Sequence, residues 1–141
     1  MRIGIGNDRT AIEYKNKICQ YLVSNGHEVI DYGVNEGEVC DYPIVGKKVA
    51  NAVIKEEITK GIVICGNGVG IGLAANKVKG IRCVTCSEPL TAKTSVEHNN
   101  TNMLSFGVKI VNIEMAIMIV DAWLESKYEE GHHQRRLDML E

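Results

Sequence analysis

One cysteine of this sequence stands between an apolar run and a loop rich in glycine. Residues 62–64 read Ile-Val-Ile, Cys65 follows, and glycine then occupies every second position from Gly66 to Gly72. Three successive β-branched residues predict a buried strand, and glycines let backbone N–H groups surround a negatively charged atom. A thiol at this junction suits chemistry on an oxyanion, and the same N–H groups are expected to favour its thiolate.

The residues that follow Cys65 exclude several familiar glycine loops. The dinucleotide fingerprint requires glycine at position 71 or 73, where the chain has Ile71 and Leu73, and no Walker motif is present. A cysteine-dependent phosphatase requires arginine at position 71. The remaining interpretation is a proton-transfer base beside an enolate-like intermediate, with a buried structural thiol in a tight turn as an equal alternative.

The other cysteines give weaker signals. Cys83 and Cys86 have the spacing of a redox pair, but residues three apart on a strand point to opposite faces, which predicts two core thiols. Cys19 and Cys40 have no histidine pair nearby at metal-ligand spacing. The sequence therefore predicts no metal site and no cofactor.

Potential cations gather near the C-terminus. Residues 131–136 read Gly-His-His-Gln-Arg-Arg, which is typical of an exposed tail and also of a phosphate clamp. His98 ends a predicted helix, where the helix dipole favours a histidine without any functional role.

These residues need a scaffold, and apolar periodicity predicts one in which strands and helices alternate. We expect strands at 2–6, 28–32, 62–65, 81–86 and 102–106, and helices at 11–24, 44–57, 73–77, 89–97 and 113–124. The alternation predicts an α/β fold with a parallel sheet, helices on both faces and ligands at the carboxyl ends of the strands. Asp8, Cys65 and Ser87 follow predicted strands and should lie at that edge.

Length and composition limit the kinds of partner that this protein can have. The 141 residues suit a single domain over 1–141, with a polar tail over 127–141. A net charge of −2 without a long basic block disfavours nucleic acid, and no apolar run is long enough to cross a membrane. Five scattered cysteines and no secretion signal indicate a reduced, soluble, cytoplasmic protein.

The ordered motifs resemble the ribose-5-phosphate isomerase B family, which also includes galactose-6-phosphate and allose-6-phosphate isomerases. The motifs that carry the resemblance are 4–8, 41–43, 65–71, 74–77, 80–82, 98–99 and 131–138. The resemblance implies a Rossmann-like three-layer sandwich with a five-stranded parallel sheet. It also implies a homodimer, or a dimer of dimers, in which the C-terminal segment reaches the partner subunit.

The resemblance further implies metal-free, cofactor-free aldose–ketose isomerisation of a sugar phosphate through a cis-enediolate. Cys65 would be the general base, Asp8 and His98 would assist ring opening, and Asn67 would also be catalytic. The enediolate would be held by Gly66, Gly68, Val69, Gly70 and Asn99. Substrate would contact Tyr42 and Arg9, and phosphate would be bound by Arg9, Lys109, His132, His133 and Arg136.

Three departures from the family pattern leave the sugar open. Arg9 replaces a histidine, His132 replaces an arginine, and Asn67 stands where the family usually has threonine or serine. D-ribose 5-phosphate to D-ribulose 5-phosphate is the leading reaction, with allose 6-phosphate, galactose 6-phosphate and a tetrose phosphate as alternatives. A non-catalytic module that binds a sugar phosphate or a nucleotide is the alternative of a different class.

Overall fold

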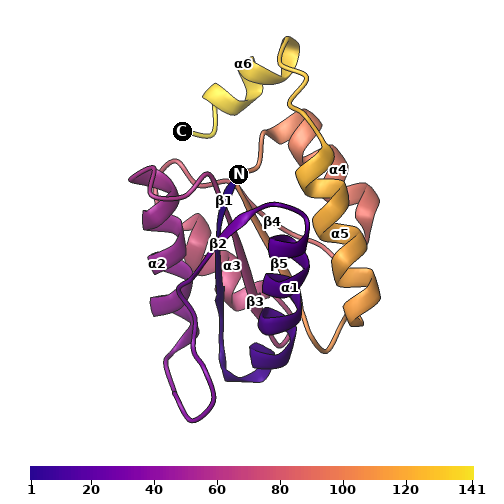
Figure 1. The fold of residues 1–141 in the computed structure, drawn as a ribbon. Coiled ribbons are helices and arrows are strands. Elements are labelled where there is room, and N and C mark those ends of the chain that lie inside the picture. The colour runs from indigo at the N-terminus through magenta and orange to yellow at the C-terminus, as the bar shows by residue number, and fades with distance from the viewer.

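A sheet of five parallel strands forms the centre of the computed structural model, which describes residues 1–141 (Figure 1). The strands are β1 (Arg2–Asn7), β2 (Glu28–Asp31), β3 (Lys60–Cys65), β4 (Cys83–Thr85) and β5 (Met103–Gly107). Their order in the sheet is β2-β1-β3-β5-β4. All strands being parallel, their carboxyl ends share one edge, and this confirms the predicted α/β fold.

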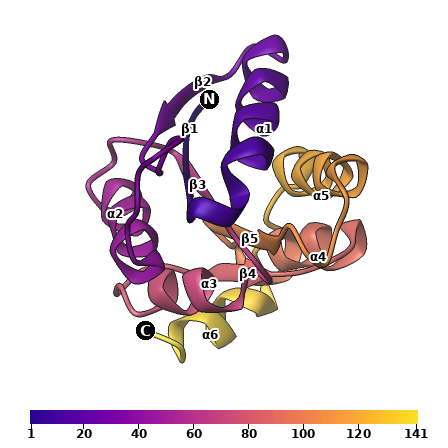
Figure 2. The ribbon, with the colours of Figure 1, turned by 90° about the horizontal axis from the view of Figure 1, so that it is seen from below.

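Helices cover both faces of the sheet (Figure 2). One face is packed by α1 (Ile12–Ser24), α4 (Pro89–Asn99) and α5 (Ile113–Glu125), and the other by α2 (Tyr42–Ile54) and α3 (Val69–Asn76). Alternate residues of β3 divide between the two layers: Ile62 and Ile64 belong to the first core and Val63 and Cys65 to the second. This alternation is the period of two that a strand buried on both sides requires.

Two helices begin where local periodicity did not place them. Helix α3 starts at Val69 instead of position 73, because Gly68 adopts a left-handed conformation (φ 81°) that turns the chain directly into the helix. Within the predicted tail, residues 132–138 form α6 (His132–Asp138), which buries Leu137. A helix of seven residues gives too weak a periodic signal to be recognised alone.

The end of α4 and all of α6 lie at the amino edge of the sheet, opposite the edge at which β3 ends with Cys65 (Figure 1). The Glu129 N–H donates to the Glu97 carbonyl at 3.0 Å, and Arg82, just before β4, forms an ion pair with Glu141 at 3.0 Å. Since β3 has six residues, the two edges are separated by roughly 16 Å of strand. Residues at the two edges of one chain therefore do not meet.

The only tryptophan packs at this edge of the sheet, opposite Cys65, and holds neighbouring segments together. Trp123 of α5 is fully buried, and its Nε1–H donates to Thr101 Oγ1 at 3.0 Å. Lys60 Nζ lies 4.5 Å from the ring centroid, in cation–π contact. Burial lowers the pKa of Lys60. Because Thr101 lies two residues after α4, this contact holds the end of α4 in place.

The two cysteines with redox spacing face opposite layers, as their spacing predicts. Cys83 packs against the core formed with α2 and α3, and Cys86 against the core formed with α1, α4 and α5. Burial raises the pKa of Cys83 to about 12 and that of Cys86 to about 11. All five cysteines are free thiols. None of the helices has the length and apolar character needed to cross a bilayer.

Candidate active site

A cleft of about 500 Å³ opens at the carboxyl edge of the sheet, where β1 and β3 end. Five side chains that can donate or accept a hydrogen bond or move a proton line it, together with the backbone of the glycine loop. The lining residues are Asp8, Tyr42, Cys65, Gly66, Asn67, Val69, Gly70, Leu73 and Lys109. The fold thus gathers most of the residues that the sequence analysis assigned to catalysis.

The thiol of Cys65 is held at the floor of the cleft. The residue is 6% exposed, and the Gly68 N–H donates to its Sγ at 3.2 Å. Ser105 Oγ donates to the Gly68 carbonyl at 2.5 Å, which orients the peptide that follows. A side chain at position 68 would place its Cβ 2.7 Å from the Phe106 carbonyl carbon. Glycine is therefore required here both for its positive φ and for this close approach.

Asn67 uses one end of its amide to begin α3. Its Oδ1 accepts the Val69 N–H at 3.0 Å, while its Nδ2 makes no hydrogen bond within the chain. The backbone of Asn67 lies against β5, where a Cβ on Gly107 would come within 2.2 Å of the Asn67 Cα. The exposed Asn67 side chain therefore offers the cleft only N–H donors.

The glycine loop retains free backbone donors. The N–H groups of Gly66 and Gly70 make no hydrogen bond within the chain and border the cleft. Those of Gly68 and Val69, which the sequence analysis also assigned to the enediolate, have intramolecular acceptors in Cys65 Sγ and Asn67 Oδ1. The number of loop amides available to an oxyanion is thus smaller than expected, because two of them organise the loop itself.

Asp8 caps the single turn η1 (Arg9–Ala11) that follows β1. Its Oδ1 accepts both the Thr10 N–H at 3.0 Å and the Thr10 hydroxyl at 2.5 Å. The second carboxylate oxygen makes no such contact. One oxygen of Asp8 therefore fixes the side chain, and the other remains available to a ligand.

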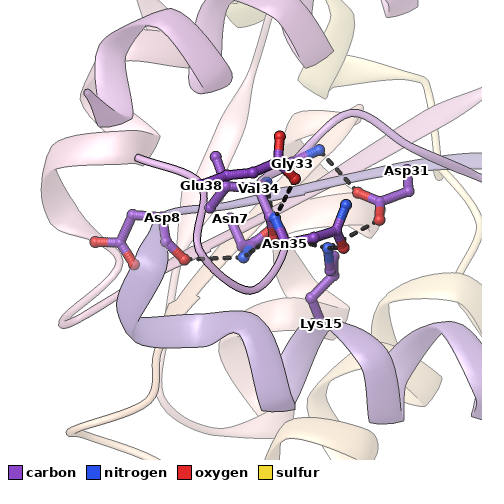
Figure 3. A network of polar contacts seen from close by, with 8 residues as sticks. All are labelled: Asn7, Asp8, Lys15, Asp31, Gly33, Val34, Asn35 and Glu38. Carbon is purple, nitrogen blue, oxygen red and sulfur yellow. Dashed lines mark hydrogen bonds and ion pairs between the residues drawn. The ribbon is translucent and has the colours of Figure 1, made fainter. Parts of the chain in front are cut away.

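A buried polar network joins β1, α1 and the loop 33–38 (Figure 3). The fully buried Lys15 donates from Nζ to Asp31 Oδ2 at 2.8 Å, to the Val34 carbonyl at 2.8 Å and to Asn35 Oδ1 at 2.6 Å. Asn7 Nδ2 donates to the Val34 and Asp8 carbonyls at 3.1 and 2.8 Å. The residue before Asp8 is thereby tied to the loop that leads into α2.

Tyr42 and Lys109 form two walls of the cleft. Tyr42 opens α2, and a Cβ on Gly70 would lie 2.7 Å from its Cε1, so the ring packs on the bare backbone of α3. The Lys109 side chain passes Gly66, whose added Cβ would be 3.8 Å from the lysine Cδ. Lys109 is the one cationic side chain among the residues that line the cleft.

Other residues assigned to the site do not line this cleft. Arg9 is exposed and lines a separate depression at the start of α1. The remaining group lies at the opposite edge of the sheet, in α4 and α6, and comprises His98, Asn99, His132, His133 and Arg136. One chain therefore contains two separate parts of the expected site.

Comparison with known proteins identifies the family. A model of the ribose/galactose isomerase family matches residues 3–140. The chain belongs to this family. It is 49% identical over 139 residues to ribose-5-phosphate isomerase B of Escherichia coli, covering 99% of this chain and 93% of the relative. It is 36% identical to D-erythrulose-4-phosphate isomerase of Pectobacterium atrosepticum, covering 99% and 93% respectively.

Solved structures of the ribose/galactose isomerase family share the fold. Ribose-5-phosphate isomerase B of Clostridium thermocellum matches with a TM-score of 0.97 at 44% identity, covering 99% of this chain and 95% of that one. The Mycoplasma genitalium protein with bound ribulose 5-phosphate matches with a TM-score of 0.94 at 37% identity, covering 99% and 93%. The chain is accordingly an isomerase, as the resemblance implied.

Sequence reasoning missed several residues that shape this cleft. Leu73 lines the cleft one helical turn after Gly70, a signal that became available only once α3 was known to start at Val69. Thr10 fixes Asp8 through a capping pattern visible in the sequence. Lys15 gave no signal, since its partners lie 16 to 20 residues away and a lysine within a helix is usually solvated.

Proposed function

We propose that this protein interconverts D-ribose 5-phosphate and D-ribulose 5-phosphate, with Cys65 as the general base. The observation that carries the proposal is the thiol on the cleft floor, which receives the Gly68 N–H and has the unpaired N–H groups of Gly66 and Gly70 beside it. Such an arrangement supports removal of a proton next to a carbonyl, because fixed donors stabilise the enediolate that results.

The isomerisation uses one base and passes through one enediolate intermediate. The Cys65 thiolate removes the proton from C2 of the open-chain aldose, and the electron pair forms a C1–C2 double bond while O1 gains negative charge. After a proton passes from O2 to O1, the thiol returns its proton to C1, which yields the ketose. The free oxygen of Asp8 is suited to accept the hydroxyl proton when the sugar ring opens.

We further propose that a second copy of the chain completes each site. Val69 and Leu73 at the rim of the cleft are 48% and 58% exposed, so apolar surface there is left for a partner to cover. His98, Asn99 and Arg136 are exposed at the other edge of the sheet, too far from Cys65 of the same chain to contact it. In a dimer, the end of α4 and α6 of one subunit would face the cleft of the other and supply cations for the phosphate.

The identity of the sugar rests on the relatives. The relative at 49% identity carries the name ribose-5-phosphate isomerase B, which favours the pentose. The relative named D-erythrulose-4-phosphate isomerase supports a tetrose phosphate as the second candidate. Galactose 6-phosphate and allose 6-phosphate are the hexose candidates. We also propose a cytoplasmic location, because all five cysteines are free thiols.

The test is proton exchange from solvent. Purified protein is incubated in D₂O with tetrose, pentose and hexose phosphates, and deuterium at C1 and C2 is followed by NMR. We expect incorporation and interconversion, fastest with ribose 5-phosphate and ribulose 5-phosphate. Faster exchange with a tetrose phosphate reassigns the substrate. Absence of exchange with every sugar phosphate contradicts isomerisation and leaves the non-catalytic binding module.

A further inference from the structure

Two histidines that are far apart in the sequence come together at the edge of the sheet opposite Cys65. His98 is the penultimate residue of α4, and His133 is the second residue of α6. Their rings stack with centroids 4.6 Å apart and planes inclined by 16°. Glu129, which precedes α6, places Oε1 3.5 Å from the Nε2 atom of each ring.

The distances in this cluster suit a shared metal ion better than a shared proton. Hydrogen bonds from nitrogen to oxygen are about 2.7–3.2 Å long, so 3.5 Å is too long for either ring. In a tetrahedral zinc site with ligand bonds near 2.0–2.1 Å, neighbouring ligand atoms lie about 3.3 Å apart. The three donor atoms here all lie within 4.8 Å of one another. Because the two rings are stacked with planes inclined by only 16°, their lone pairs do not converge on one point, and binding requires the His98 side chain, which is 48% exposed, to turn toward Glu129 and His133.

The segments that carry the ligands are tied to each other. The Glu129 N–H donates to the Glu97 carbonyl at 3.0 Å, which fixes Glu129 beside the last turn of α4. The His133 side chain is only 13% exposed. Tyr128 donates its hydroxyl to Gln134 Oε1 at 3.0 Å, which closes the turn before α6. The cluster is thus held by backbone and side-chain bonds that do not involve the ligand atoms themselves.

We propose that His98, Glu129 and His133 bind a divalent transition-metal ion, with Zn²⁺ the preferred occupant and water in the open coordination position. Two imidazoles and one carboxylate are the ligand types of zinc sites, whereas Mg²⁺ and Ca²⁺ favour oxygen donors alone. The bound ion occupies His98 Nε2. Because the proposed dimer turns the end of α4 toward the partner's cleft, Zn²⁺ bound at His98 should inhibit the reaction, and this consequence rests on the proposed function.

Calorimetric titration of the full-length protein, carrying no histidine tag, with ZnCl₂ tests the site directly. We expect about one ion per chain in the wild type, and affinity at least about tenfold weaker in Glu129→Gln and in His133→Asn. Cys65→Ser and His27→Asn are the matched controls and should bind as the wild type does. Thermal unfolding without metal verifies that the four variants are folded.

Cobalt provides a spectroscopic check on the ligands. Co²⁺ bound at this site should show d–d absorption without the charge-transfer band of a thiolate ligand. A thiolate band that disappears in Cys65→Ser, or wild-type affinity in both Glu129→Gln and His133→Asn, overturns the proposal.

Inhibition forms a separate arm of the experiment. Zn²⁺ should slow the turnover of ribose 5-phosphate by the wild type, a chelator should restore it, and Glu129→Gln should be less sensitive. Absence of turnover before any metal is added counts against the proposed function alone, because calorimetry still decides whether the site binds zinc. Metal binding without inhibition removes the regulatory consequence and leaves the site.

Discussion

Asn67 shows how one hydrogen bond can define what a side chain offers a ligand. With Oδ1 occupied by the Val69 N–H, the amide presents only Nδ2 to the cleft. An amide in this position donates to an oxygen but cannot accept and pass on a proton, which a hydroxyl can do. We therefore expect Asn67 to stabilise the enediolate and to leave the movement of hydroxyl protons to Asp8 or water.

Asn67→Asp tests this role with almost no change of shape. Aspartate keeps an acceptor for the Val69 N–H and replaces the two N–H donors by an anionic oxygen facing the enediolate. We expect kcat to fall about 100-fold or more, with little change in the melting temperature. Asn67→Ser, which keeps a donor, should remain within about tenfold of the wild type. Equal activity in all three proteins would restrict Asn67 to capping α3.

Cys65→Ser tests the base. A hydroxyl in place of the thiol should reduce deuterium exchange by about 10²- to 10⁴-fold, the range that a positioned base contributes. Cys40→Ser, which alters a half-buried thiol in a loop outside the cleft, is the control. NMR exchange rates and kcat measure the effect. A Cys65→Ser protein with undiminished exchange would rule out the thiol as base.

At the scale of elements, the loop between β2 and α2 depends on Lys15. Its ammonium group fills a site formed by Asp31, Asn35 and a backbone carbonyl, and Asn7 ties the same loop to the end of β1 (Figure 3). Asp8 follows Asn7 directly and Tyr42 opens α2, so the network ties the end of β1 that bears Asp8 to the loop that leads to Tyr42.

Lys15→Met should destabilise the protein by about 2–4 kcal/mol, since it leaves a buried carbonyl and amide oxygen without their donor and Asp31 without its counter-ion. Urea unfolding measures the loss. Lys17→Met is the matched control, because Lys17 lies on the same helix and pairs with Glu13 in solvent. Its unfolding midpoint should stay at the wild-type value. A Lys15→Met midpoint equal to that of the control would show that the network is dispensable.

Cys83, in β4, and Cys86, directly after it, should not form a disulfide with each other under oxidising conditions. Cys83 and Cys86 face opposite layers, and burial raises the pKa of both thiols well above neutral pH, so neither geometry nor ionisation favours a disulfide. We expect no Cys83–Cys86 disulfide after treatment with diamide, as measured by peptide mass spectrometry. Detection of that linkage in folded protein would contradict the observed orientation.

Local signals and non-local contacts explain which features the sequence could predict. The strand at 62–65 and the glycine loop after Cys65 are each encoded by residues adjacent in the sequence, and both are found in the structure. The pairing of His98 with His133 joins residues 35 positions apart, and no local periodicity encodes it. The same holds for Lys15, whose burial depends on a loop that follows the next strand.

At the scale of the whole molecule, the expected site is divided between two edges of one sheet. The thiol and the free N–H groups lie at the carboxyl edge, and the exposed His98 and Arg136 lie at the other, across roughly 16 Å of strand. A twofold dimer would bring one half of each chain against the other half of its partner. The proposed activity then belongs to a pair of chains.

Mixing two inactive variants tests this division. Cys65→Ala removes the base, and Arg136→Ala removes a cation from the other edge, so each homodimer should be impaired. A mixed dimer has one intact site, and equal amounts refolded together should recover about a quarter of wild-type activity. Light scattering establishes the dimer in each sample. A mixture that forms dimers but is no more active than its components would contradict a site shared between two chains.

The fluorescence of the single tryptophan reports on the edge of the sheet opposite Cys65. Trp123 is bonded to Thr101, which follows α4, and it lies beneath the ammonium group of Lys60. Any rearrangement at the end of α4 should change the polarity and charge around its indole, and thus the wavelength and intensity of its emission. Events near His98 and Asn99 can therefore be followed by intrinsic fluorescence, without a label, while the cleft around Cys65 contains no tryptophan to obscure the signal.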